Sequence, residues 1–197
     1  AYHRSPEGEL GFIAPDDRTV TPIEECYIIR PELLAMRTAI TPTARRVRCM
    51  VGSDGSERVV SQSDDGSPAA ADQGDDETIS AAAADKVTFT IHGETFRVSA
   101  GSFFQVNLAQ AARLVELVMD QVDLSGRELV LDLYSGVGLF TAFLAQGAKR
   151  VTAIELAPSA VSDARVNLAR FTNIDVFEGS TEAMLPRVKG KFDAAVI

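Results

Sequence analysis

Hydrophobic and polar positions change their spacing about halfway along the chain. Apolar residues recur at helical intervals in 107–122, and beyond them short apolar runs alternate with further helical segments. Strands are predicted at 128–134, 150–156, 174–179 and 192–197, and helices at 138–147, 159–171 and 180–188. Strands that alternate with helices favour a parallel sheet with right-handed crossovers, so this half is predicted to be a Rossmann-like α/β domain.

The first half has a shorter period, and Gly, Pro and Asp interrupt its apolar runs. This pattern predicts a hairpin in 8–29 and a short helix over 31–40 that begins at Pro31. Further strand pairs are expected in 44–62 and 86–100, where apolar and polar residues alternate. A small β-rich α+β module is therefore predicted ahead of the α/β domain.

An acidic stretch, residues 61–84, separates these regions. Ile79 is its only large aliphatic residue, so the stretch cannot bury enough apolar area to offset the entropy of ordering. We predict a flexible acidic loop within a first domain of residues 1–94, followed by a second domain of residues 95–197. Of the net charge of −9, a net −7 comes from the nine acidic and two basic residues between Val51 and Lys86, so the rest of the chain is nearly neutral.

Composition excludes several classes of protein. A chain of 197 residues with 46% hydrophobic content can bury a sizeable core. It has no run of 18 apolar residues, which predicts no membrane span, and its first residues lack the apolar core of a secretory signal. Its two cysteines, Cys26 and Cys49, lie outside any C-x-x-C pattern, which fits a reducing compartment and predicts a cytoplasmic protein.

The first strand of the α/β half leads into a glycine loop, "VLDLYSGVGLF". Gly136 and Gly138 stand between a strand and a helix, where glycine lets the backbone approach a ligand. Thr141 occupies the position at which a dinucleotide fingerprint has Gly or Ala. Asp132, near the end of the strand, is predicted to place a carboxylate close to the ligand mouth, where it would repel phosphates and suit a cationic amino-acid cofactor. S-adenosylmethionine is therefore favoured over a nicotinamide dinucleotide.

The second strand ends in another acid, Glu155. A carboxylate at this strand end can accept hydrogen bonds from both ribose hydroxyls of a nucleoside ligand. Since S-adenosylmethionine and NAD both carry a ribose, Glu155 is consistent with either cofactor and does not distinguish between them.

The segment "SAGSFFQVN", residues 99–107, precedes the helix that leads into the domain. Its spacing predicts that Phe103 and Phe104 pack in a core. Gln105 and Asn107 carry amide side chains suited to the polar edges of a base or to a cofactor carboxylate.

Taken together, four segments resemble the RNA uracil-5-methyltransferase family: "FRVSAGSFFQVN", "VLDLYSGVGLF", "VTAIELAPSAVSDARVNLAR" and "FDAAVI". The resemblance covers residues 95–197 and continues more weakly through 11–36. It implies a class I methyltransferase fold, S-adenosylmethionine as the cofactor, and an RNA substrate (rRNA or tRNA) that is converted to 5-methyluridine. It points to neither a membrane nor a protein partner.

The resemblance also implies roles for single residues. It places Phe104 at the border of the target base, and Ser180 where relatives often have an acid or amide beside the adenine. Gln105, Tyr134 and Glu155 match the family's cofactor-contacting positions. The glycine loop adds Gly136 and Gly138 to the residues that we expect to bind the cofactor.

In this family a cysteine thiolate adds to C6 of the uracil, and a carboxylate base later removes the C5 proton. Both residues follow the strand that corresponds to 192–197. No catalytic residue is therefore expected in this chain, which we expect to be truncated and inactive by itself. Cys49 is predicted to be a buried thiol. Cys26 resembles the last ligand of an iron–sulfur cluster in some members, but a cluster would need upstream cysteines, so no metal site is predicted here.

Three alternatives remain open from the sequence. The domain could methylate another substrate, or it could be an NAD-dependent oxidoreductase. It could also be a non-catalytic RNA-binding module that uses Arg45, Arg46 and Arg48.

Overall fold

The structure is a computed structural model that describes residues 2–16, 18–27, 29–40, 46–55, 58–63, 86–188 and 190–197. The chain divides into two compact units, Ala1–Val87 and Thr88–Ile197. Most of the predicted acidic loop, from residue 64 onward, lies outside the described residues, as does Arg45; residues 61–63 belong to a strand.

The first unit is built on a five-stranded antiparallel sheet of order β3-β2-β1-β4-β5. The hairpin, short helix and strand pair predicted here are confirmed. The three-residue strand β1 was not predicted, because so short a segment shows no period. The elements are β1 (Tyr2–Arg4), β2 (Leu10–Ile13), β3 (Val20–Pro22), α1 (Pro31–Ala35), the 3-10 helix η1 (Met36–Ala39), β4 (Arg46–Val51) and β5 (Arg58–Ser63).

One face of this sheet carries the core of the first unit. The ring of Tyr2 stacks on Phe12 with 5.5 Å between centroids. Cys49 packs against the same cluster, which has as its buried members Tyr2, Met36, Ile40, Val47 and Val51.

The second unit combines a two-stranded hairpin with a four-stranded parallel sheet of order β10-β9-β8-β11. This is the predicted Rossmann-like arrangement, with each of the four expected strands in place. The elements are β6 (Lys86–Ile91), β7 (Glu94–Ser99), α2 (Leu108–Val122), β8 (Leu129–Leu133), α3 (Leu139–Gly147), β9 (Arg150–Glu155), α4 (Pro158–Asn167), β10 (Ile174–Glu178), α5 (Thr181–Met184), the 3-10 helix η2 (Leu185–Arg187) and β11 (Ala194–Val196).

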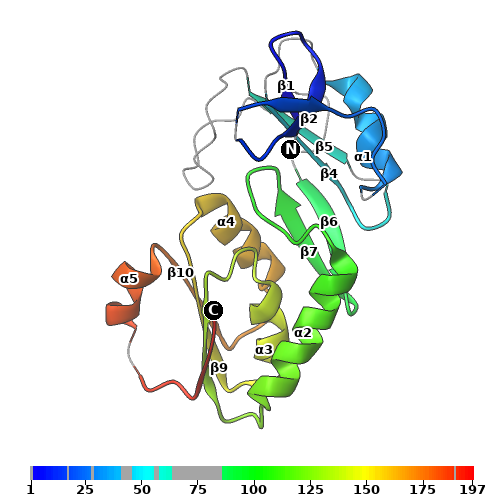
Figure 1. The fold of residues 1–197 in the computed structure, drawn as a ribbon. Helices are drawn as coiled ribbons and strands as arrows, with labels where there is room; N and C mark the ends of the chain where they lie inside the picture. The colour runs from blue at the N-terminus through cyan, green and yellow to red at the C-terminus, as the bar shows by residue number, and fades with distance from the viewer. Residues whose placement is uncertain are drawn as a thin grey trace. The chain divides into compact units, whose positions relative to one another are not determined.

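Side-chain alternation along the parallel strands forms a core on each face of the sheet. Val130 and Val151, which are partners in register, pack with Leu144 of α3 on one face. Leu131 and Ile154 belong to the core of the opposite face, where Met184 at the end of α5 packs against them. In Figure 1, α2, α3 and α4 lie on one side of this sheet and α5 on the other.

The division at Val87 falls seven residues before the boundary predicted at 94. The hairpin β6–β7 groups with the parallel sheet because its aromatic residues pack there. Phe89 of β6 stacks on Phe104 with 4.7 Å between centroids, and Phe96 of β7 lies 6.3 Å from Phe143 of α3. None of the helices in the described ranges combines the length and the apolar content that a membrane span requires.

Candidate functional site

The glycine loop connects β8 to α3 through a sharp reversal of the backbone. Tyr134, Gly136 and Gly138 have φ angles of 60°, 56° and 89°, in the left-handed region. Tyr134 is the non-glycine member of this set, and the residue is 59% exposed. A bulky residue held at positive φ stores strain, a feature that clusters at functional sites.

The two glycines of the loop differ in their surroundings. A Cβ atom added at Gly136 would meet no atom within 4 Å, so this position faces open space. A Cβ added at Gly138 would lie 2.9 Å from Cδ1 of Leu168, a buried residue just beyond α4. Gly136 therefore leaves room for a ligand, whereas Gly138 is required for close packing of the loop on the helix layer.

Asp132 does not lie open at the ligand mouth, contrary to the prediction. Its side chain is buried and accepts a hydrogen bond from the hydroxyl of Thr141 in α3. Burial raises the pKa of the Asp132 carboxyl from 3.8 to about 7; the hydrogen bonds from Thr141 oppose this shift, and the charge of Glu155 adds to it. The pair joins the end of β8 to the first turns of α3, which explains a threonine at position 141.

Glu155 lies beside the glycine loop at the end of β9. Its Oε2 atom accepts a hydrogen bond from the Gly136 backbone N–H at 2.8 Å, and Oε1 accepts one from the Ala157 N–H at 2.8 Å. A carboxylate offers about four lone-pair sites, so two such bonds leave acceptor capacity for ribose hydroxyls. Tyr134, Gly136 and Gly138 therefore share one loop, and Glu155 is hydrogen-bonded to that loop.

The segment 99–107 presents one of its two phenylalanines to solvent. The core packing predicted for both is wrong for Phe103, which is 71% exposed, and confirmed for Phe104, which is 8% exposed and stacks on Phe89. Gln105 is exposed. Asn107 caps α2, where its Oδ1 atom accepts a hydrogen bond from the Gln110 N–H at 3.1 Å.

Two residues of α4 that the sequence analysis missed connect these parts. Asp163 accepts hydrogen bonds from Ser99 and Ser102, directly before the phenylalanines, and Asn167 donates to the backbone oxygen of Val137 in the glycine loop. A signal existed in the sequence. Both polar side chains fall on the apolar face of the helix, in register with its buried alanines.

The remaining candidates have structural surroundings. Ser180 caps α5, accepting a hydrogen bond from the Ala183 N–H at 3.3 Å. Burial raises the pKa of the Cys49 thiol to about 11, which keeps it protonated and poorly nucleophilic. Cys26 and Cys49 are both free thiols. No group of three or more His, Cys, Asp or Glu side chains within the described ranges could hold a metal ion.

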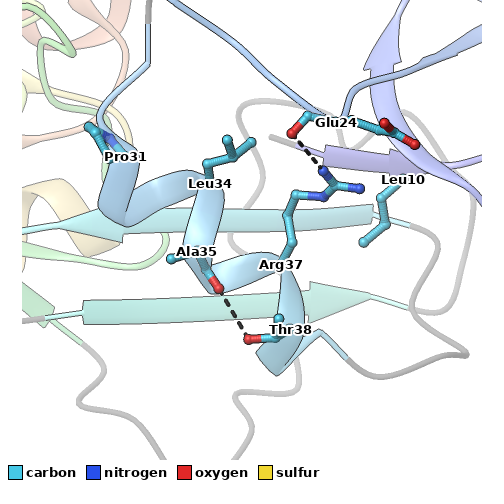
Figure 2. A pocket seen from close by; sticks show the side chains of 7 residues that line it. All are labelled: Leu10, Glu24, Pro31, Leu34, Ala35, Arg37 and Thr38. Carbon is cyan, nitrogen blue, oxygen red and sulfur yellow. Dashed lines mark hydrogen bonds between the residues drawn. The ribbon is translucent and has the colours of Figure 1, made fainter.

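The first unit has a hollow of about 550 Å³ along α1 (Figure 2). Arg37 lies at this hollow and donates a hydrogen bond to the Glu24 backbone oxygen at 3.4 Å. The lining is Leu10, Glu24, Pro31, Leu34, Ala35, Arg37 and Thr38. None of the residues predicted to bind cofactor or substrate lies among them.

Comparison with known proteins identifies the second half of the chain. A family model described as tRNA (uracil-5-)-methyltransferase matches residues 84–193, more than half of the chain. An RNA methyltransferase of Listeria innocua is 39% identical over 105 residues, which cover 52% of this chain and 23% of that protein. One from Enterococcus faecalis is 40% identical over 116 residues, covering 57% of this chain and 25% of that protein. The chain spans about a quarter of the length of these relatives.

A solved structure supports the fold. The tRNA (uracil-54, C5)-methyltransferase of Pyrococcus abyssi, in complex with S-adenosyl-L-homocysteine, matches with a TM-score of 0.70 at 18% identity. The match covers 100% of this chain and 57% of that chain. The predicted class I methyltransferase fold is confirmed. By its sequence match and its fold, the chain belongs to the tRNA (uracil-5-)-methyltransferase family.

Proposed function

We propose that this protein uses S-adenosylmethionine to methylate C5 of a uridine in rRNA or tRNA, and that residues 88–197 supply its cofactor site. The observation that carries the proposal is the hydrogen bond between Glu155 and the Gly136 N–H at 2.8 Å. Because of this bond, the Glu155 carboxylate, which can accept further hydrogen bonds, lies directly beside Gly136, where the space next to the backbone is open.

Each site residue has a distinct task in this proposal. Glu155 accepts hydrogen bonds from the ribose hydroxyls, and Gly136 lets the cofactor approach the backbone. The exposed ring of Tyr134 packs on the adenosyl group, and the amide of Gln105 contacts the polar amino-acid part of the cofactor. Gly138 acts indirectly, since it lets the loop pack on Leu168.

The base-contacting aromatic residue in this proposal is Phe103 in place of Phe104. A target base must leave its stack to reach a pocket, and an exposed ring can then stack on it. Phe104 is unsuited to this contact because its ring already stacks on Phe89. Phe103, one residue earlier, is 71% exposed.

The methylation itself requires a nucleophile and a base. S-adenosylmethionine supplies an electrophilic methyl group, but C5 of uracil attacks it only after a thiolate has added to C6. Cys49 does not suit this role because its thiol stays protonated, and Cys26 does not match the family's nucleophile position. We therefore place the nucleophile outside this chain, together with the base, which the family resemblance puts in the same later segment, and we expect residues 1–197 alone to bind cofactor without turnover.

An isotope-release assay tests the reaction. The full gene product is incubated with S-adenosylmethionine and an RNA that carries tritium at C5 of its uridines, with a C6-labelled RNA as control. Methylation at C5 displaces that hydrogen, so we expect tritium release in step with methyl incorporation from the C5-labelled RNA alone. Methyl incorporation without release would show that another atom is the acceptor.

A further inference from the structure

The carboxylate of Asp163 in α4 is fully buried and saturated with hydrogen bonds. Its Oδ2 atom accepts from the Ser99 N–H at 2.7 Å and from the Ser102 hydroxyl at 2.7 Å. Its Oδ1 atom accepts from Arg97 Nε at 2.9 Å and from the Ser99 hydroxyl at 2.9 Å. A buried charge persists only when it is paired and hydrogen-bonded in this way. All of these donors belong to residues 97–102, the segment that leads directly into Phe103.

Asn167, one helical turn later on the same face of α4, makes a second set of bonds. Its Oδ1 atom accepts from the Arg97 N–H at 2.9 Å, and its amide nitrogen donates to the Arg97 carbonyl at 3.0 Å. The same nitrogen donates to the Val137 carbonyl at 3.0 Å. Val137 lies between the two glycines of the loop, so this one side chain joins β7 to the glycine loop.

The proposed cofactor site has three parts, which are Glu155, the segment 99–107 and the glycine loop. Helix α4 is attached to all three. It begins just after Glu155, which itself accepts a hydrogen bond from the Ala157 N–H at the N-cap of the helix. Asp163 holds the segment before Phe103 and Gln105, and Asn167 holds the glycine loop. Because a helix is rigid, these contacts set the positions of the three parts relative to one another.

We propose that Asp163 and Asn167 are positioning residues of the cofactor site, which hold the segment 99–107 and the glycine loop in the geometry that binds S-adenosylmethionine. The inference rests on the proposed function in naming that ligand, whereas the ordering of the two segments does not depend on it. Neither residue touches the cofactor in this scheme. Each acts on affinity by keeping the binding-competent arrangement populated.

The test compares Asp163→Asn and Ser102→Ala with a control on the same helix, Val161→Ala. Val161 is fully buried, so its truncation lowers stability without removing a hydrogen bond of the network. S-adenosylhomocysteine affinity is measured by calorimetry, and amide hydrogen exchange is followed in peptides covering 99–107 and 134–138. Thermal melting reports the stability of each variant.

We expect Asp163→Asn to weaken S-adenosylhomocysteine binding about tenfold, and Ser102→Ala about threefold, because each lowers the population of the ordered segment. Exchange in 99–107 should accelerate in both variants without ligand. Val161→Ala should melt at a lower temperature yet keep its affinity within about twofold. Ser102→Ala removes a single hydroxyl, so it remains informative if Asp163→Asn does not fold.

The outcomes separate the two proposals. Absence of S-adenosylhomocysteine binding by the wild-type chain would contradict the proposed function, while the exchange data would still test the ordering. If the wild type binds and Ser102→Ala shows unchanged affinity and unchanged exchange in 99–107, the positioning role is refuted. An affinity loss in Val161→Ala that matches its loss of stability would also refute it, because general destabilisation would then explain the effect.

Discussion

Replacing Gly138 with alanine should destabilise the protein more than the same change at Gly136. Both glycines have positive φ, so each substitution costs about 1–2 kcal/mol for a left-handed L-residue. At Gly138 the new methyl would also lie 2.9 Å from Leu168 Cδ1 and 3.1 Å from its Cγ. Leu168 is 4% exposed, so it cannot swing into solvent, and such overpacking adds about 1–3 kcal/mol.

The expected loss in the free energy of unfolding is therefore about 1–2 kcal/mol for Gly136→Ala and about 2–5 kcal/mol for Gly138→Ala. Urea denaturation followed by far-ultraviolet circular dichroism measures both. The double variant Gly138→Ala/Leu168→Ala isolates the contact. With Leu168 truncated, the further change at Gly138 should cost no more than Gly136→Ala does. Equal losses for the two single variants would refute the assignment of Gly138 to packing.

Three further predictions concern the buried acid, the ribose-binding acid and the two phenylalanines. In the folded state the Asp132 carboxyl stays protonated up to about pH 7, whereas in the unfolded chain it loses its proton near pH 3.8. The free energy of unfolding should therefore fall as the pH rises between these two values, by on the order of 4 kcal/mol. Asp132→Asn should flatten this slope in unfolding measured at several pH values, and an unchanged slope would assign it to another group. Glu155→Gln should weaken S-adenosylhomocysteine binding in calorimetry by about 1–3 kcal/mol, because an amide nitrogen cannot accept the hydrogen bonds that the second carboxylate oxygen offers to a backbone N–H and to the ribose hydroxyls, while the exposed control Glu182→Gln should have no effect. Phe104→Ala should lower the free energy of unfolding by about 3–5 kcal/mol, because its ring is buried against Phe89. Phe103→Ala should leave that free energy nearly unchanged and weaken RNA binding in a filter assay. Destabilisation by Phe103→Ala together with weaker RNA binding by Phe104→Ala would contradict the roles given to the two rings.

The strand and helix order of residues 128–197 could be predicted because its apolar runs are long enough to show a period. The alternation of side chains along the strand also indicates the face on which Asp132 lies. Asp132 shares a face with Val130, which packs against α3, so the side chain of Asp132 must point toward that helix. The identity of its partner, Thr141, depends on the rotation of α3, and the sequence pattern does not contain it.

Other features of the site could not be predicted, because they depend on contacts between distant residues. Two adjacent phenylalanines in a loop have no period, so nothing local decides which one is buried. Asp163 meets Arg97 across 66 positions of the sequence. A polar residue on an apolar helix face signals that a partner exists, but the packing of β7 on α4 decides which residue it is.

Calorimetric titration of the 197-residue chain measures whether the glycine loop and Glu155 form a site for S-adenosylmethionine. We predict that S-adenosylhomocysteine binds, that NAD does not, and that Glu155→Gln weakens the S-adenosylhomocysteine titration while Glu182→Gln leaves it unchanged. Binding of NAD in place of S-adenosylhomocysteine, or S-adenosylhomocysteine binding that is equally tight in Glu155→Gln, would show that the glycine loop and Glu155 do not form this site.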